Sequence, residues 1–289
     1  MKNLPDFIII GAMKSATSTL YDQLVSQPGI FMTVPKEPNF FSDDEQYTKG
    51  LDWYKSLYSE AAEGDILGEA STHYTKLPTY PETIERIKQA GLKPRLIYVM
   101  RHPVDRLISH YMHEYSQGEI SCDINDAITK YDSLITYSKY SVQLEPYIKT
   151  FGFESILPVF FDSFRLNPES ELTRICDFIG YSHKPEWVAE LAKGNVSSKR
   201  IRKFPLYNIL VDSKLATWFR RKFIPKSIRS TIKNSLRQQK RPQLNVKSLK
   251  ELENIFNQDL NIIGNWLGVD ISCENFKEIT SNDILKWNV

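Results

Sequence analysis

The stretch FIIIGAMKSATSTL, residues 7–20, decides the fold of this 289-residue chain. Its β-branched run stops at Gly11, and small or hydroxyl-bearing residues then lead into a helix that we expect to continue to residue 27, before Pro28 and Gly29. A short buried strand, a tight loop and a helix in this order predict the opening unit of a parallel sheet.

Further strands and helices alternate along the first 200 residues. The expected strands are 30–34, 66–70, 95–100 and 156–161. Pro158 lies inside the last of them, which predicts an edge strand or a bulge. Prolines in the favoured first-turn position open helices at residues 81, 103 and 168. This alternation predicts an α/β, three-layer, P-loop-like fold with a central parallel sheet flanked by helices.

Beyond residue 200 the pattern is helical only, with an apolar stripe over residues 249–267. We expect one domain over 1–289, with an α/β core over 1–205 and a helical extension over 206–289 that is first basic and then acidic. The apolar content of 41% and the charged content of 25% exclude a disordered, collagen-like or disulfide-dense chain.

The three cysteines lack the spacing of a disulfide framework or a zinc site, which favours a reducing compartment. Lys14 interrupts the apolar run from Phe7 to Met13 after seven residues, too soon for a signal peptide, and no run reaches the length of a membrane span. We therefore expect a cytoplasmic protein.

The small net charge of +2 hides a strong asymmetry. Residues 191–250 carry 17 basic side chains and one acid, Asp212, whereas the segments on either side are acidic. Such a block predicts a surface that faces an anion, and its residues 214–250 allow contact with a membrane surface or an acidic glycan. A solvated helical face explains the same pattern equally well.

The loop after the first strand is a candidate anion site. Small residues let the backbone approach a ligand, the first N–H groups of the helix are unpaired, and Lys14 adds a cation. The hydroxyls come from Ser15, Thr17, Ser18 and Thr19. The GxxxxGK(S/T) pattern of triphosphate-binding loops is not met, because only two residues separate Gly11 from Lys14. A plain helix start with a solvent-exposed lysine is the alternative.

A second candidate site follows the strand at 95–100. Arg101 stands at its carboxyl end, where ligands of open α/β sheets gather, and Ser109 lies about two helical turns onward. An arginine fork with a hydroxyl suits a phosphate monoester. The alternative is an arginine that caps a loop carbonyl.

Glu37 is a candidate base. The segment KEPNFF, residues 36–41, follows the second strand, so Glu37 is expected at the same sheet edge as Lys14. A carboxylate there can accept a proton from a hydroxyl or an amine. A surface charge in a proline-bracketed loop is the alternative.

Taken together, these segments resemble sulfotransferases that use 3′-phosphoadenosine 5′-phosphosulfate (PAPS). GAMKSATSTL is similar to their 5′-phosphosulfate loop, with Ala16 where glycine is usual. Residues 101–111 resemble the 3′-phosphate motif RDPxxRxxSxY, with His102 in place of aspartate. KEPNFF is similar to the KExxFF element of the heparan-sulfate-type enzymes, which act on carbohydrates.

The resemblance implies transfer of a sulfuryl group from PAPS to a hydroxyl or amine of a carbohydrate or small molecule, leaving 3′,5′-adenosine bisphosphate and needing no metal. The resemblance also implies that Lys14 and Glu37 are catalytic residues. The implied donor-binding residues are Lys14, Ser15, Ala16, Thr17, Ser18, Thr19, Arg101, Ser109, Lys199 and Arg200. Lys36 and His73 are the candidates for contact with the acceptor, because the lysine of several glycan-acting members is replaced by Ala70.

Two other functions stay open. A P-loop-type small-molecule kinase requires a triphosphate-loop lysine and an acidic residue at a strand end, and the strand at 95–100 ends in Arg101. A non-catalytic anion-binding or membrane-surface protein would use the basic block alone. We expect no nucleic acid partner, and the sequence leaves the oligomeric state undetermined.

Overall fold

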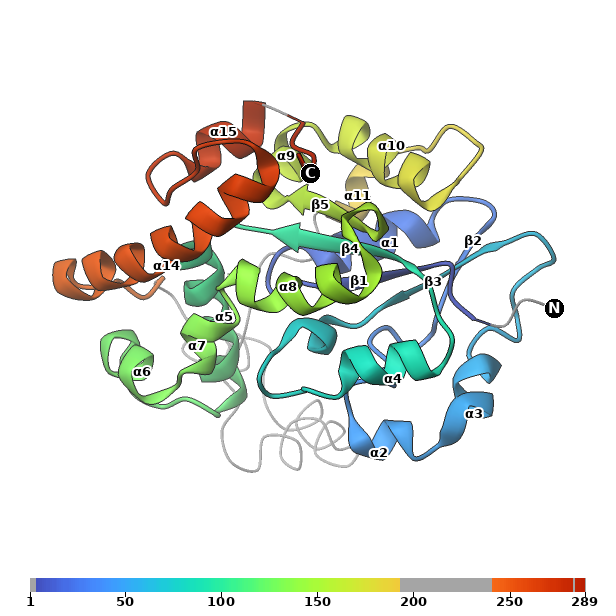
Figure 1. Ribbon diagram of the computed structural model, residues 1–289, viewed down its shortest axis with the longest axis horizontal. Coiled ribbons are helices and arrows are strands. Elements are labelled where there is room, and N and C mark those ends of the chain that lie inside the picture. The colour runs from blue at the N-terminus through green and yellow to red at the C-terminus, as the bar shows by residue number, and fades with distance from the viewer. Residues whose placement is uncertain (1–3, 193–240, 283, 289) are drawn as a thin grey trace, which may run out of the picture.

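The core of the molecule is a five-stranded sheet in which every pairing is parallel. The computed structural model describes residues 4–192, 241–282 and 284–288 (Figure 1). The strand order is β2-β3-β1-β4-β5. The strands are β1 (Phe7–Gly11), β2 (Ile30–Met32), β3 (Ile66–Ala70), β4 (Arg95–Met100) and β5 (Ile156–Phe160). All five predicted strands are confirmed, and β2 ends two residues earlier than expected.

Pro158 lies on the edge strand β5, as its missing N–H predicts. It pairs with Tyr98 of β4. The C-terminal segment runs beside the start of this strand, where the indole nitrogen of Trp287 donates to the carbonyl oxygen of Ile156 at 2.7 Å. The exposed edge of the sheet is therefore partly covered by the end of the chain.

Helices cover both faces of the sheet and give the predicted three layers (Figure 1). On β1, Phe7 and Ile9 pack into one apolar cluster, whereas Ile8 and Ile10 pack into the other. The first cluster includes side chains of α1 (Thr17–Val25), α9 (Phe161–Leu166) and α10 (Pro168–Ile179). The second includes side chains of α3 (Gly50–Ser56), α4 (Thr83–Gln89), α5 (Pro103–Gln117), α6 (Ile124–Lys130), α7 (Ser133–Thr136), α8 (Tyr140–Phe151) and α14 (Val246–Leu267).

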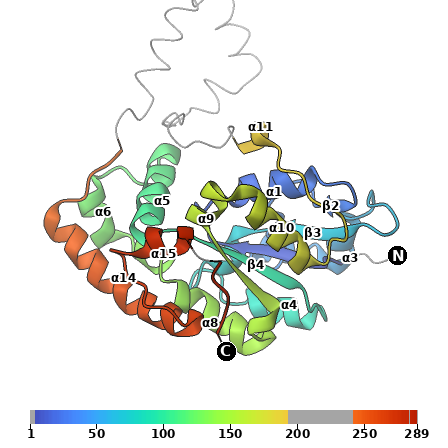
Figure 2. The ribbon, with the colours of Figure 1, turned by 90° about the horizontal axis from the view of Figure 1, so that it is seen from above.

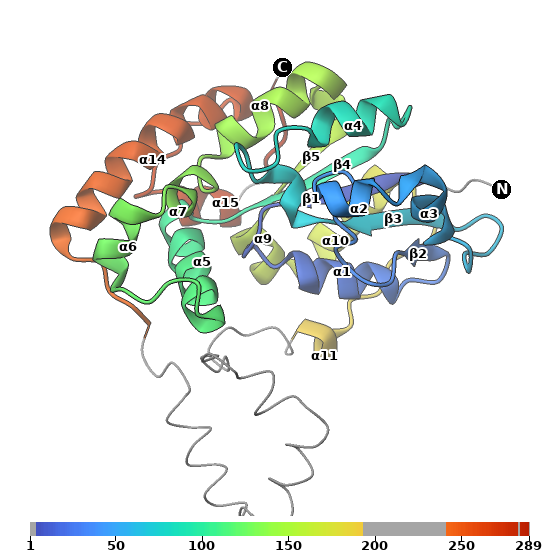
Figure 3. The ribbon, with the colours of Figure 1, turned by 90° about the horizontal axis from the view of Figure 1, so that it is seen from below.

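The long C-terminal helix α14 packs along α8 on the same core (Figures 2 and 3). Its predicted stripe is buried at Leu252, Phe256, Leu260 and Ile263. Its Asp259 accepts hydrogen bonds from the backbone N–H and, at 2.5 Å, the hydroxyl of Ser141 in α8. The remaining described helices are α2 (Asp44–Tyr47), α11 (Ala189–Ala192), α15 (Phe276–Asn282) and the 3₁₀ turns η1 (Thr72–Thr75) and η2 (Phe153–Ser155).

The carboxyl ends of the strands meet at one edge of the sheet, because all strands are parallel. The chain lays β2 and β3 on one side of β1 and then β4 and β5 on the other, so the direction of winding reverses beside β1. Open parallel sheets bind their ligands at such a switch point. Among the helices of the described ranges, none is long and apolar enough to cross a membrane.

A candidate active site at the carboxyl edge of the sheet

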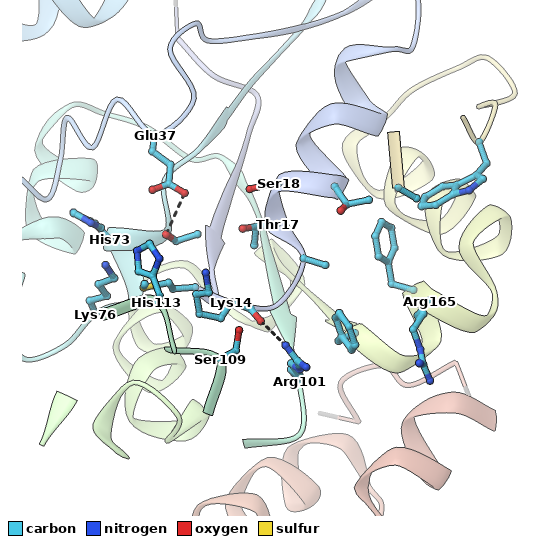
Figure 4. A pocket seen from close by; sticks show the side chains of 18 residues that line it. Lys14, Thr17, Ser18, Glu37, His73, Lys76, Arg101, Ser109, His113 and Arg165 are labelled. Atoms are coloured by element: carbon cyan, nitrogen blue, oxygen red, sulfur yellow. Dashed lines mark hydrogen bonds between the residues drawn. The ribbon is translucent and has the colours of Figure 1, made fainter. Parts of the chain in front are cut away.

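A cavity of about 660 Å³ opens at this edge (Figure 4). Lys14, Thr17 and Ser18 lie in its middle, with Glu37 toward one end and Arg165 toward the other. Its full lining is Met13, Lys14, Ala16, Thr17, Ser18, Thr19, Glu37, Thr72, His73, Lys76, Arg101, Ser109, His113, Phe161, Phe164, Arg165, Trp187 and Ala192. The segments that follow all five strands therefore contribute residues to one site.

The loop after β1 bends through two left-handed residues. Lys14 has φ 73° and Ala16 has φ 67°, a conformation that L-residues other than glycine, asparagine and aspartate rarely adopt. Because Ala16 is left-handed, α1 begins at Thr17 rather than within the loop as the sequence suggested. No described side chain caps this helix end, so its first N–H groups and its dipole face the cavity uncapped.

Five of the six loop residues predicted to bind the donor line the cavity. The exception is Ser15, whose side chain is fully buried outside the lining and whose hydroxyl has no hydrogen-bond partner among the described residues. The expected hydroxyl contact from Ser15 therefore does not reach the cavity. Sequence could not reveal this, because the left-handed neighbours on either side set the direction of the side chain.

Arg101 lines the cavity beside Ser109, as predicted. Its Nη1 donates to the carbonyl oxygen of Lys14 at 3.2 Å, and its guanidinium carbon lies 4.5 Å from the centre of the Phe161 ring. Its Nε is buried and has no partner within the described part of the chain. Arg101 therefore caps a loop carbonyl, as the alternative interpretation predicted, and it also lines the cavity.

Glu37 reaches the cavity from a strained loop. Its φ is 60° and that of Asn39 is 52°. Its backbone N–H donates to the carbonyl oxygen of Ala70 at 3.0 Å, and Thr72 Oγ1 donates to its Oε1 at 3.3 Å. Lys36 Nζ lies 2.8 Å from the same oxygen. Burial alone would raise the pKa of Glu37, but the charge and hydrogen bond of Lys36 and the charges of His73 and Lys76 outweigh burial and lower that pKa.

Lys36 is therefore bound to Glu37 and does not line the cavity. Sequence reasoning had named it as a candidate for contact with the acceptor. His73 does line the cavity, with its ring stacked on that of Tyr80 at 4.8 Å. Burial, and then the charge of Lys76, lower the pKa of His73 to about 4, so its imidazole is neutral at neutral pH.

Lys76 and His113 stand beside Glu37 and His73 in Figure 4, and sequence reasoning missed both. Burial lowers the pKa of Lys76 to about 8, against the opposing charge of Glu37. No hydrogen bond or ion pair joins the Lys76 ammonium to a described residue. His113 follows Ser109 by four positions on α5, so it shares a helix face with Ser109, and that spacing was a usable signal.

The opposite end of the cavity was also missed. Phe161, Phe164 and Arg165 follow β5 directly, and the ring of Phe164 lies edge-on to Trp187 at 5.3 Å. Aromatic walls with a guanidinium suit the flat face of a nucleobase. A short apolar strand followed by Phe-Asp-Ser-Phe-Arg looks like core in the sequence, so only the parallel topology reveals this end.

Lys199, Arg200 and most of the basic block, residues 193–240, lie outside the described residues. The donor contacts implied for Lys199 and Arg200 and the membrane or glycan contact over 214–250 therefore remain predictions. Across the ranges that the structure describes, no group of three or more His, Cys, Asp or Glu side chains could hold a metal ion.

The chain matches a family model described as the sulfotransferase domain over residues 4–264. It is 35% identical over 191 residues to mouse heparan sulfate glucosamine 3-O-sulfotransferase 3A1, covering 62% of this chain and 46% of the relative. The human 3B1 enzyme is 34% identical, with 62% and 47% covered. The matched region thus spans about half the length of these curated relatives.

Solved structures share the fold. A sulfotransferase from Alicyclobacillus acidocaldarius superposes with a TM-score of 0.65 at 21% identity, covering 93% of this chain and 97% of that one. Mouse sulfotransferase SULT7A1 complexed with PAP gives a TM-score of 0.52 at 14% identity, with 90% and 85% covered. At such identities the likeness concerns the fold alone.

Proposed function

The chain belongs to the sulfotransferase domain family, and on that premise we propose that it transfers a sulfuryl group from PAPS to a carbohydrate hydroxyl or amine. The observation that carries the proposal is the single cavity in which Lys14, the amino end of α1 and Arg101 stand with Glu37. An anion-binding centre with a carboxylate at one end is the arrangement that such a transfer requires.

The donor end is supported by three features of the described residues. The amino end of α1 has no side-chain cap, Lys14 supplies a cation, and Arg101 offers a buried Nε without a described partner. These donors match the phosphate groups of a nucleotide bisphosphate. We assign the 5′-phosphosulfate to the loop after β1 and the 3′-phosphate to Arg101 and Ser109, with the nucleobase against the aromatic wall that includes Phe164 and Trp187.

PAPS supplies an activated sulfuryl group on a phosphate oxygen. The chain's own residues then position and stabilise charge, as in phosphoryl transfer. The acceptor oxygen or nitrogen forms the bond to sulfur, and its proton passes to Glu37. The bond between sulfur and the phosphate oxygen breaks, and Lys14 and the amino end of α1 stabilise the charge left on that oxygen.

A carbohydrate acceptor is supported by the curated relatives, whose printed names specify glucosamine in heparan sulfate. We place the acceptor at the end of the cavity formed by Glu37, His73, Lys76 and His113. These groups present hydrogen-bond donors and acceptors of the kind that orient sugar hydroxyls. Lys76 supplies a cation at this end of the cavity.

The kinase alternative is weakened by the residue at the end of β4, which is Arg101 and not an acid for magnesium. A purely anion-binding protein leaves unexplained why Glu37 is held at the cavity by its backbone and by Thr72. Sulfuryl transfer accounts for both.

The direct test is transfer of ³⁵S from labelled PAPS in the presence of EDTA. The acceptors are an N-sulfated heparan oligosaccharide, an unsulfated glucosamine-containing disaccharide and a simple phenol. We expect label in a carbohydrate and none without enzyme. Label in the phenol alone would refute the carbohydrate acceptor. Transfer of ³²P from ATP with magnesium, without any ³⁵S transfer, would establish the kinase instead.

A further inference from the structure

Glu69 is a fully buried carboxylate on β3 that the proposed transfer does not use. Ser71 Oγ donates to its Oε1 at 2.5 Å, and the hydroxyl of Tyr54 donates to its Oε2. The Tyr74 hydroxyl is a further neighbour and helps to oppose the rise in the pKa of Glu69. Burial raises the pKa of Glu69, while the hydrogen bonds from these hydroxyls oppose the rise. Burying a carboxyl group away from water costs free energy, which hydrogen bonds from neighbouring hydroxyls offset only in part. The burial of Glu69 therefore requires an explanation.

The same hydroxyls hold the loop that carries Glu37. Three alternate backbone N–H groups of this loop donate to the segment after β3. That of Glu37 donates to the carbonyl oxygen of Ala70 at 3.0 Å, that of Asn39 to Ser71 Oγ at 3.1 Å, and that of Phe41 to the Tyr74 hydroxyl at 3.3 Å. Two of the three acceptors are therefore hydroxyls that contact Glu69.

The carboxylate of Glu69 sets the orientation of the Ser71 hydroxyl. A hydroxyl has one hydrogen to donate, and Ser71 commits it to Glu69. The lone pairs of Ser71 Oγ are then left to accept the N–H of Asn39. Without Glu69, the hydroxyl hydrogen could rotate toward other acceptors, and the loop would lose a fixed anchor.

The loop needs such anchors. Glu37 and Asn39 both have left-handed backbones, and such strain persists only where the surroundings hold it in place. We propose that Glu69 is a positioning residue of the active site: it orients the Ser71 hydroxyl, and Ser71, together with Tyr74, fixes the strained loop so that Glu37 faces the cavity. The inference rests on the proposed role of Glu37 as the base.

The test compares Glu69→Met and Ser71→Ala with the control Tyr58→Phe. Glu69→Met removes the carboxylate that accepts the Ser71 hydroxyl, and Ser71→Ala removes the link between Glu69 and Asn39. Tyr58→Phe removes a buried hydroxyl of the same aromatic cluster, one that contacts Tyr54 and not the loop. Three quantities are measured: amide hydrogen exchange of the peptide that contains residues 37–41, the affinity for 3′,5′-adenosine bisphosphate, and the pH dependence of turnover.

We expect Glu69→Met and Ser71→Ala each to speed exchange in residues 37–41 at least tenfold and to lower turnover about 10- to 100-fold, with bisphosphate affinity changed less than threefold. In these variants the acid limb of the pH profile should move to higher pH, toward the ordinary pKa of a glutamate. The reason is that Glu37 is no longer held beside the positive charges that lower its pKa. Tyr58→Phe should alter none of these. If Ser71→Ala proves unstable, Tyr74→Phe removes the second anchor and should give the same pattern.

Wild-type exchange and turnover in a folded Ser71→Ala protein would overturn the inference. So would an exchange increase spread evenly over the whole domain, which marks general destabilisation. If the wild-type protein transfers no sulfuryl group, the proposed function fails, yet the exchange measurement still decides whether Glu69 and Ser71 hold the loop.

Discussion

Arg101 Nη1 donates a hydrogen bond to the carbonyl oxygen of Lys14 at 3.2 Å, across 87 residues of sequence. This contact joins the loop after β1 to the end of β4, and the two strands are neighbours in the sheet. The two segments that we assign to the phosphates of the donor are therefore one structural unit. A change at Arg101 should disturb the loop geometry as well as its own contact with a phosphate.

Glu37→Gln should lower turnover about 100- to 10,000-fold, because the amide cannot accept the acceptor's proton. Affinity for 3′,5′-adenosine bisphosphate should change little, since Glu37 lies toward the other end of the cavity from Arg165. Steady-state kinetics with a calorimetric titration checks both. Glu45→Gln, an exposed acid on α2, is the matched control. Near wild-type turnover in Glu37→Gln would remove Glu37 from the role of base.

Ala16→Gly should stabilise the protein by up to about 1 kcal/mol, because it relieves a left-handed backbone at φ 67°. Greater freedom of the unfolded chain offsets part of that gain. Ala127→Gly, in the buried interior of α6, should instead destabilise by about 1 kcal/mol. Denaturant unfolding compares the two, and a loss of stability in Ala16→Gly would contradict the left-handed geometry.

Lys76→Met should raise stability at pH 7 by about 1 kcal/mol while lowering turnover. The folded protein lowers the pKa of Lys76 to about 8, so folding disfavours its charged form. The loss of folding stability caused by the charged Lys76 is fully present below about pH 8 and fades as the pH rises toward the ordinary pKa of lysine. The stability gained in Lys76→Met should therefore shrink between pH 7 and pH 10. Thermal unfolding of both proteins at pH 7 and pH 10 measures this gain, and an equal gain at both pH values would argue against a buried charge.

Turnover should fall as the pH rises through about 8, because Lys76 loses its positive charge there. The same limb should be absent in Lys76→Met. On the acid side, the lowered pKa of Glu37 keeps the base ionised below the ordinary range of a glutamate. A pH series of kcat/KM with saturating donor tests both limbs, and an alkaline limb that survives in Lys76→Met would assign it to another group.

The sheet was predictable from sequence because its strands are short, mainly apolar runs that alternate with helical segments. Pro158 even marked the edge strand, since a central strand has no place for a residue without an N–H. The shared cavity was predictable for the same reason: parallel strands bring Lys14, Glu37 and Arg101 to one edge.

Side-chain direction was not predictable. Ser15 and Thr17 carry similar hydroxyls two positions apart, yet only Thr17 lines the cavity, because two left-handed residues turn the loop. Sequence reasoning named Lys36 and passed over Lys76, and only the folded loop shows that Lys36 pairs with Glu37. Glu69 was hidden because a carboxylate in a strand carries no sign of the hydroxyls around it.

The central claim is a PAPS site that uses Arg101, and calorimetric titration with 3′,5′-adenosine bisphosphate tests it most directly. The titration is run beside ATP with magnesium on the wild type, Arg101→Ala and Arg95→Ala, which changes the exposed arginine at the other end of β4. We predict tight binding of the bisphosphate without metal, much weaker binding of ATP, and a loss of affinity in Arg101→Ala alone. Preferential, magnesium-dependent binding of ATP, or bisphosphate binding that survives in Arg101→Ala, would contradict the account.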